Sequence, residues 1–334
     1  MRRLSLLVWA VAVVAALCGR PIAVSAQGAT PTAQDATFPD TMGLPEIQVA
    51  ATDTTFEGVP TETAAGRYLV TFTNNATDPE GAAIHFMQLP EGFTVEMLTM
   101  PPPDAVETPM AGMGEGSPVA EEGGNAEGTP DWFYEVYQAG GTIALPGRTA
   151  QVILDLIPGN YAVWGGFPDL PQAPVGLTVT GDMGASPMAG MAEPTADVTV
   201  TEVKTADGYV FDLEGTLTPG LNVIEIVNDS DQPHFFFVER YPEPITLEQV
   251  QAFLMFDPSM GTPPAGIIDE SLLELTVSAS TQSAGTTQWL AVNLEPGSHI
   301  ISCFVEDPTQ GGIPHAFEGM IDVIQVGDEG TPAS

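Results

Sequence analysis

The chain contains 334 residues, of which 44 are acidic and 7 are basic, for a formal net charge of −37, and 43% are hydrophobic. The hydrophobic fraction is large enough for folded domains, but the charge excludes nucleic acid as a partner, because nucleic-acid affinity comes largely from Lys and Arg that displace counterions. The length is typical of two domains, and 35 Gly with 31 Pro indicate many turns and argue against an all-helical bundle.

The N-terminus has the pattern of an export signal. Arg2 and Arg3 precede an apolar run over residues 4–17, and small residues at the end of the segment suit cleavage. We therefore predict a signal peptide over residues 1–26. The mature protein is then secreted, periplasmic or attached to the cell surface.

Both cysteines bear on this prediction. Cys18 lies inside the predicted signal; it is also an alternative site of lipid attachment, although Leu17 before it is bulkier than the residue that usually precedes such a site. After cleavage, Cys303 is the only cysteine left, which excludes an intramolecular disulfide. No later stretch is long and apolar enough to span a bilayer as a helix.

Composition divides the rest of the chain into two folded segments joined by a linker. The lead-in is rich in Ala, Thr, Pro and Gln and lacks apolar periodicity, as does the linker, so both are expected to be disordered. The predicted limits are 27–45 for the disordered lead-in, 46–181 for the first domain, 182–196 for the linker, 197–327 for the second domain and 328–334 for the tail.

The two folded segments resemble each other, so each serves as a comparison for the other. Each contains a β-rich run, at residues 68–75 and 222–229, followed by a polar loop and then a histidine that opens another strand. These histidines are His85 in the first segment and His234 in the second.

The later parts of the two segments also correspond. A short helical signal is clearest in the second, where Thr246 and Gln249 are placed as a capping box. Alternating strands follow at residues 152–156 and 290–294, and a Pro-Gly turn ends each. Short strands with turn residues between them predict an all-β chain of two tandem Greek-key β-sandwiches.

The second segment carries four residues of one chemical set: His234, and then Cys303, His315 and Met320. Two imidazoles, a thiolate and a thioether are the ligands of a blue-copper electron-transfer site. A strand that ends at Cys303, a loop that carries His315 and a strand that starts near Met320 would bring three of them to one end of a sandwich. Each residue alone is ordinarily structural, but the only mature cysteine and two of the four histidines stand in this order.

With these residues the sequence resembles the cupredoxin family, which includes plastocyanin and azurin and whose ligands run His, then Cys, His and Met. Eleven residues separate Cys303 from His315 and four separate His315 from Met320, a spacing similar to the ligand loop of copper nitrite reductases. The resemblance implies two cupredoxin-like domains and one type 1 copper per chain. It implies His234, Cys303 and His315 as equatorial ligands and Met320 as the axial ligand.

The first segment lacks this set. It keeps His85, but Gly165 stands at the cysteine position, approximately Gln172 at the second histidine and Leu177 at the methionine. We therefore expect the first domain to be metal-free and His85 to be structural. His299 occupies the position of a tyrosine in the first segment, Tyr161, and is also interpreted as structural.

Four methionines lie in twin MAGM strings within the flexible segments. Soft thioethers can bind Cu(I), but repetitive linker composition is the preferred interpretation. The four are Met110, Met113, Met188 and Met191.

Tandem cupredoxin-like domains also occur in nitrite reductases and small laccase-type oxidases, whose further copper centres need more histidines. Only His85 and His299 remain here, and Ser302 precedes Cys303 where nitrite reductases have a bridging histidine. We therefore expect no enzyme but an exported one-electron carrier with a redox partner protein. Its acidic surface would steer a cationic partner, or the charge simply keeps the exported protein soluble, and neither interpretation is preferred. The alternative is a structural or interaction protein, or a copper-binding protein with a vestigial site and no redox role.

Overall fold

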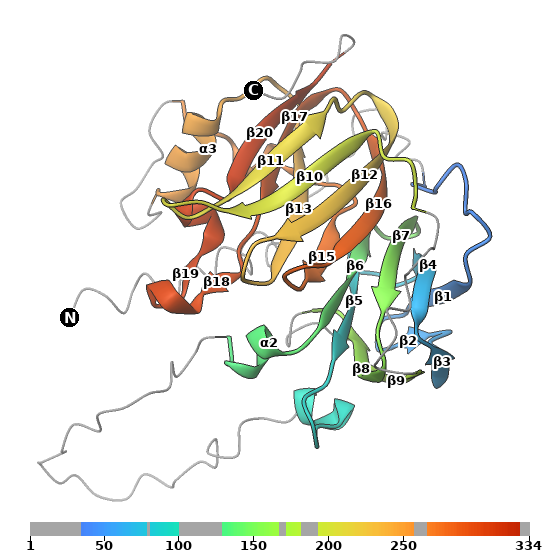
Figure 1. The fold of residues 1–334 in the computed structure, drawn as a ribbon. Coiled ribbons are helices and arrows are strands. Elements are labelled where there is room, and N and C mark those ends of the chain that lie inside the picture. The colour runs from blue at the N-terminus through green and yellow to red at the C-terminus, as the bar shows by residue number, and fades with distance from the viewer. Residues whose placement is uncertain are drawn as a thin grey trace, which may run out of the picture.

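A computed structural model of the chain describes residues 35–78, 81–99, 129–166, 172–181, 193–256 and 266–327. The predicted all-β fold is confirmed, because strands, nearly all of them in two large sheets, make up about half of the described chain and helices only a small part (Figure 1). The predicted signal peptide, the tail, residues 182–192 of the linker and the four MAGM methionines lie outside the described residues. In the part of the chain that is described, no helix has the length and apolar character needed to cross a bilayer.

The first half of the described chain contains nine strands, one 3-10 helix and one short α-helix. They are β1 (Glu46–Ala51), β2 (Phe56–Glu57), β3 (Glu62–Ala64), β4 (Gly66–Asn74), β5 (Ala82–Gln88), η1 (Val95–Thr99), α2 (Trp132–Glu135), β6 (Gln138–Ala144), β7 (Thr149–Leu156), β8 (Gly159–Trp164) and β9 (Val175–Thr180).

The second half contains further strands, the longest described α-helix and three 3-10 helices. They are β10 (Val198–Lys204), β11 (Tyr209–Gly215), β12 (Gly220–Asp229), β13 (His234–Tyr241), α3 (Leu247–Leu254), η3 (Glu270–Leu272), β14 (Glu274–Leu275), β15 (Ala279–Gln282), β16 (Thr287–Leu294), β17 (Gly297–Ser302), β18 (Glu306–Asp307), η4 (Pro308–Gln310), β19 (Ile313–Pro314), η5 (His315–Glu318) and β20 (Ile321–Val326).

The two halves share one topology, in agreement with the sequence repeat. In one sheet, β4 lies between parallel β1 and antiparallel β7, just as β12 lies between parallel β10 and antiparallel β16. In the other sheet, β5 lies between β6 and β8, as β13 lies between β15 and β17. The strand that carries His85 and the strand that opens with His234 are therefore equivalent.

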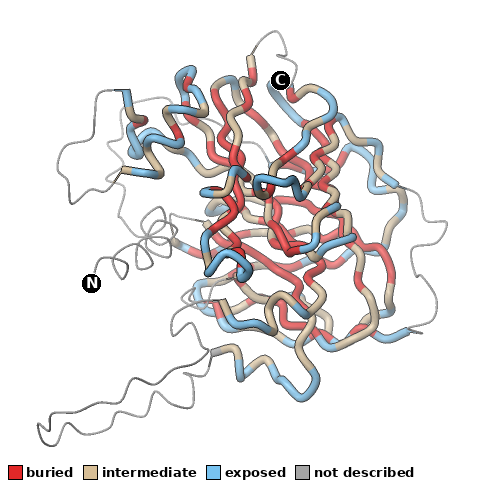
Figure 2. Tube along the Cα trace, turned by 60° about the vertical axis from the view of Figure 1, so that its left-hand side comes forward, coloured by how far each residue is buried: buried red, intermediate tan, exposed pale blue. Residues whose placement is uncertain are grey.

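Both sheets continue from one half into the other. Strand β16 pairs with β7, and β15 pairs with β6, which gives sheets of eight and ten strands that each pass through the whole molecule. One buried hydrophobic cluster includes side chains of both halves, and Figure 2 shows the buried segments running through the centre of the molecule. Because no boundary separates the two cores, the domain limits drawn from composition stay a prediction.

Equivalent local hydrogen bonds recur in the two halves. At the end of β4 the side chain of Asn74 caps the backbone N–H of Ala76, and at the end of β12 that of Asn228 caps the N–H of Ser230. The hydroxyl of Tyr161 donates to the carbonyl four residues earlier, at Ile157, and a ring nitrogen of His299 likewise contacts the carbonyl of Glu295 at 2.9 Å. His299 thus occupies the same kind of corner as Tyr161.

The structure corrects the prediction of a disordered lead-in for residues 35–45. The backbone N–H of Phe38 donates to the side chain of Gln151 at 2.8 Å, and Ala36 and Phe38 are both buried. They pack with Ile153 and Trp289 where β7 meets β16. The sequence pattern failed here because two apolar side chains suffice to cover the outer face of this junction. Residues 27–34 lie outside the described residues.

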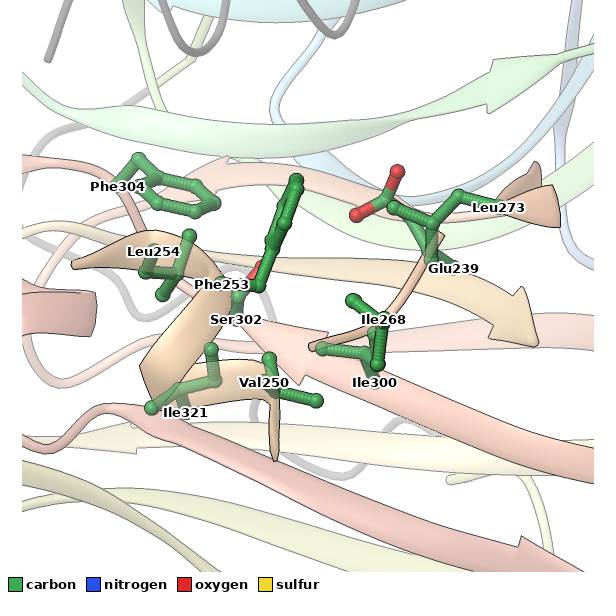
Figure 3. Close-up of a pocket in the computed structure, with 10 residues that line it drawn as sticks. All are labelled: Glu239, Val250, Phe253, Leu254, Ile268, Leu273, Ile300, Ser302, Phe304 and Ile321. Carbon is green, nitrogen blue, oxygen red and sulfur yellow. The ribbon is translucent and has the colours of Figure 1, made fainter. Parts of the chain in front are cut away.

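Helix α3 begins with the predicted capping box, in which the side chains of Thr246 and Gln249 accept hydrogen bonds from each other's backbone N–H groups. Its apolar side chains close a small pocket over β13 and β17 (Figure 3). Glu239 and Ser302 are the polar residues of this lining, and no histidine is part of it.

The junction between the halves generates a stability prediction. Gly141 on β6 has a positive φ of 153°, and a Cβ atom there would collide with the backbone carbonyl of Ile84 on β5. The Gly141→Ala change should lower the free energy of unfolding by about 2–3 kcal/mol, because the backbone of β5 cannot move aside as the end of a flexible side chain could. Gly147→Ala is the control: its φ is 70° but no atom lies within 4 Å, so only about 1 kcal/mol of backbone strain is expected. Equal losses for both variants in urea unfolding would contradict this account.

Candidate metal centre

Four strand ends bring the predicted ligands to one end of the second half. His234 is the first residue of β13, Cys303 follows β17, His315 opens η5 and Met320 precedes β20. All four residues are fully buried. The turn between η5 and β20 is possible because Gly319 has a positive φ of 116°, in the region that favours glycine.

Three of the four predicted ligands have their donor atoms close together. The sulfur of Cys303 lies 3.6 Å from Nδ1 of His234 and 3.7 Å from Nδ1 of His315. One donor atom from each of the three residues lies within 4.8 Å of the others. A metal about 2.3 Å from sulfur and about 2.0 Å from nitrogen at tetrahedral to trigonal angles would separate these atoms by about 3.5–3.7 Å, so the spacing and chemistry of the donors fit a metal ion.

Backbone hydrogen bonds tie Met320 to the same centre. The N–H of Cys303 donates to the carbonyl of Met320 at 3.1 Å, and the N–H of Met320 donates to the carbonyl of His315 at 2.9 Å. The N–H of Ala316 closes the loop on the carbonyl of Cys303 at 2.7 Å. The side chain of Met320 belongs to the same buried cluster as Cys303.

Side chains of the loop between β12 and β13 hold the outer edges of both imidazoles. Nε2 of His234 lies 2.7 Å from the hydroxyl of Ser230, and Nε2 of His315 donates to Oε1 of Gln232 at 3.1 Å. The amide of Gln232 in turn donates to Asp307 at 2.8 Å. Since Nε2 of His315 faces an acceptor oxygen, its proton sits there and the lone pair of Nδ1 faces the sulfur.

The aromatic ring of Tyr209, on β11, packs against both imidazoles. Its centroid lies 4.4 Å from that of His315 and 4.9 Å from that of His234. Its hydroxyl donates to Asp231 at 2.8 Å, and the ammonium of Lys204 lies over the ring at 5.4 Å. Tyr209 therefore separates the imidazoles from solvent.

The sequence reasoning missed the residues around the four predicted ligands. Ser230 and Gln232 lie in the polar loop before His234, which the repeat had located but not assigned. Tyr209 and Asp307 gave no signal, because their contacts form only between segments distant in sequence. A second possible metal-binding group, of Asp307, His315 and Glu318, shares His315 with the first.

Burial keeps the three donor side chains neutral. It lowers the pKa of His315 to about 4, lowers the pKa of His234 well below its usual value, and raises the pKa of the Cys303 thiol. Both imidazoles are thus neutral near pH 7, the form that binds metals. The thiol has to lose its proton to become a ligand, so only a bound cation would make the buried thiolate favourable.

The equivalent position in the first half is built differently. His85 is buried, its ring stacks on Trp164 with centroids 6.2 Å apart, and burial lowers its pKa to about 4. Leu177 lies in the core, and the side-chain amide of Gln172 donates to the carbonyl of Thr52. Within the described residues, no group of three possible metal-ligating side chains includes His85.

No family model and no curated protein matches this sequence. Solved structures similar to the chain include a multicopper oxidase, at 14% identity over 88% of this chain and 93% of the other with a TM-score of 0.21. A copper nitrite reductase from Nitrosomonas europaea matches at 13% identity over 86% and 95%, with a TM-score of 0.22. The reduced auracyanin of Roseiflexus castenholzii matches at 17% identity over 39% and 94%, with a TM-score of 0.24.

Two buried carboxyl groups near the centre have raised pKa values. Burial raises the pKa of Glu202 to about 8; its Oε2 accepts a hydrogen bond from Gln282, whereas no partner is found for its buried Oε1. Burial in the pocket beneath α3, and then the charge of Glu270, raise the pKa of Glu239 to about 7 (Figure 3). Both groups are favoured in the protonated, neutral form.

Because the pKa values of these two carboxyl groups are raised, we predict that the free energy of unfolding falls as pH rises. Because the pKa of Glu239 is higher in the folded than in the unfolded chain, its contribution is complete below the unfolded pKa and is lost as pH rises through about 7. Between about pH 5 and about pH 8, the Glu239→Gln variant should lose on the order of 2 kcal/mol less unfolding free energy than the unchanged protein. Urea unfolding at about pH 5 and about pH 8 measures it, and Glu248→Gln on the exposed face of α3 is the control. An unchanged pH dependence in Glu239→Gln would contradict the prediction.

Proposed function

We propose that the chain is an exported carrier of single electrons with one type 1 copper, held by His234, Cys303 and His315 as equatorial ligands and by Met320 as the axial ligand. The observation that carries the proposal is the buried group of a cysteine sulfur with one Nδ1 at 3.6 Å and another at 3.7 Å. Two imidazoles, a thiolate and a nearby thioether are the ligand set of a one-electron copper site. Bound copper would supply the redox couple. The residues around it would limit how far the donor atoms move when the charge of the ion changes.

The protein's own part is to hold the donors in place before the metal arrives. Backbone hydrogen bonds fix the segment from Cys303 to Met320, and Ser230 and Gln232 orient the two imidazoles. Complete burial excludes water from the centre. Donors that are fixed and dry favour electron transfer, because little rearrangement accompanies a change of charge.

We propose no enzymatic activity. A further copper centre would need further histidines, and the two others are committed elsewhere, with His85 stacked on Trp164 and His299 bonded to the backbone of its own corner. Ser302, next to Cys303, lines the pocket beneath α3. That pocket offers one carboxyl group and one hydroxyl group among apolar side chains (Figure 3).

One observation favours the alternative, a structural or interaction protein or a copper-binding protein without redox traffic. Both imidazoles are fully buried beneath Tyr209, so neither ring can touch a partner directly. Electrons would therefore have to pass through at least one further residue. A centre that binds copper but exchanges electrons with no external reductant would support this alternative.

Copper loading tests the proposal. Purified protein with one equivalent of Cu(II) should turn intensely blue and bleach reversibly on reduction, because thiolate coordination produces the colour. Cys303→Ser should abolish the colour completely. His85→Ala should leave it unchanged, since His85 lies in the other half; loss of colour in that variant would show that the first half takes part in binding.

The axial position gives a separate prediction. Met320→Leu keeps the buried volume nearly constant and should retain both copper and colour. It should raise the reduction potential, because loss of the thioether removes electron donation that stabilises the oxidised ion more than the reduced one. Voltammetry of the two loaded proteins measures the shift, and an unchanged potential would exclude Met320 as a ligand.

A further inference from the structure

A polar cleft of about 330 Å³ lies between the two halves, next to the candidate centre. One wall comes from the first half, with Gln88, Tyr134 and Glu135, and the other from the second half, with Asp231, Gln232 and Ser283. We propose that this cleft is the electron-exchange contact and that it receives a positively charged group of the redox partner. The inference rests on the proposed function for its redox part, whereas the binding of a cation is independent of copper.

From the cleft, a single side chain reaches an imidazole. Gln232 lines the cleft and accepts the Nε2 proton of His315 at 3.1 Å. On the neighbouring side, Asp231 accepts the hydroxyl of Tyr209, whose ring packs on both imidazoles. A partner seated in the cleft is therefore one residue away from a ligand, although both ligand rings are fully buried.

The charge of the lining fits a cation. Its two charged members, Glu135 and Asp231, are acidic. Burial raises the pKa of Tyr134 to about 12, and the nearby carboxylates of Glu306, Asp307 and Asp131 add to the rise, which indicates a negative potential along this wall.

Lys204 lies outside the lining and pairs with Asp231 at 2.6 Å. Both side chains of this pair are about half exposed, at 46% and 59%, and exposed pairs of this kind contribute little and exchange readily. The pair therefore does not prevent a cation from entering beside Asp231.

The walls are fixed to each other, so the cleft is part of the folded structure. The hydroxyl of Tyr134 donates to the backbone carbonyl of Glu306 at 2.8 Å, and the N–H of Gln138 donates to the hydroxyl of Ser283 at 2.8 Å. The half without the predicted ligands thus builds one side of the contact. In the exchange itself one electron passes from the reduced partner to the oxidised centre, and no bond in the cleft forms or breaks.

The first experiment uses copper-free protein and the paramagnetic cation hexaamminechromium(III). Amide signals of residues 135–137 and 283–284 should broaden at lower probe concentration than signals elsewhere. In Glu135→Gln/Asp231→Asn the required concentration should rise roughly tenfold, from the loss of two contacts with unit charges. Glu62→Gln/Asp212→Asn makes the same change of charge at exposed positions on β3 and β11 and should leave the broadening at the cleft unchanged. Broadening spread evenly over the acidic surface would overturn the proposal.

The second experiment uses the copper-loaded protein and hexaammineruthenium(II) as a cationic reductant. The rate of bleaching should fall roughly tenfold in Glu135→Gln/Asp231→Asn, within the range that electrostatic steering covers, and not in the matched control. Ala284→Trp fills the cleft without a change of charge and should also slow bleaching, whereas Ala64→Trp on β3 should not. Unchanged rates in both cleft variants would overturn the cleft as the electron contact. A loaded protein without colour would instead refute the proposed function, while the chromium experiment would still decide whether the cleft binds a cation.

Discussion

The register between β17 and β20 is the constraint on which the centre depends. Ser302 lies opposite Ile321, so the next residues on either side, Cys303 and Met320, face each other and share a backbone hydrogen bond. A slip of one residue would turn every side chain of one strand to the other face of the sheet. The segment between these residues then returns His315 to the sulfur, because its N–H bonds to the carbonyl of Val305 and that of Ala316 to Cys303. A loop of this length keeps its shape through such bonds.

The half without the predicted ligands acts on the centre through continuous sheets. Strand β15 pairs with β13, which carries His234, on one side and with β6 on the other, so the first half supports the strand next to the imidazole. The buried amide of Gln288 strengthens this junction by accepting from the N–H of Gly141 and donating to the carbonyl of Ser280. The centre therefore lies in a sheet with both neighbours in place, rather than at a free edge.

Features that repeat between the two halves, or that depend on the order of residues along the chain, could be predicted from the sequence. Contacts between segments distant in the sequence largely could not. The grouping of His234, Cys303 and His315, the capping box at Thr246 and the correspondence of Tyr161 with His299 could all be read from spacing. In the structure the three donor atoms lie close together, the capping box is formed, and the two corner side chains bond alike. The prediction of a disordered lead-in was wrong from residue 35 onward, because composition does not show that Phe38 packs on the junction of β7 and β16. Tyr209, Gln232 and the cleft could not be predicted, since each requires segments that meet only after folding.

Two requirements of the proposed buried redox centre oppose each other, and the loop between β12 and β13 meets both. Water must be kept from the donors, which the ring of Tyr209 and the burial of both imidazoles achieve. Electrons must nevertheless reach the surface over a short distance. Residues of this one short loop hold both outer nitrogens, through Ser230 and Gln232, and Asp231 and Gln232 also form part of the cleft wall. Because the hydrogen bond that orients the imidazole of His315 also ends at the cleft, the orientation of this ring and the proposed electron exchange cannot be altered independently at Gln232.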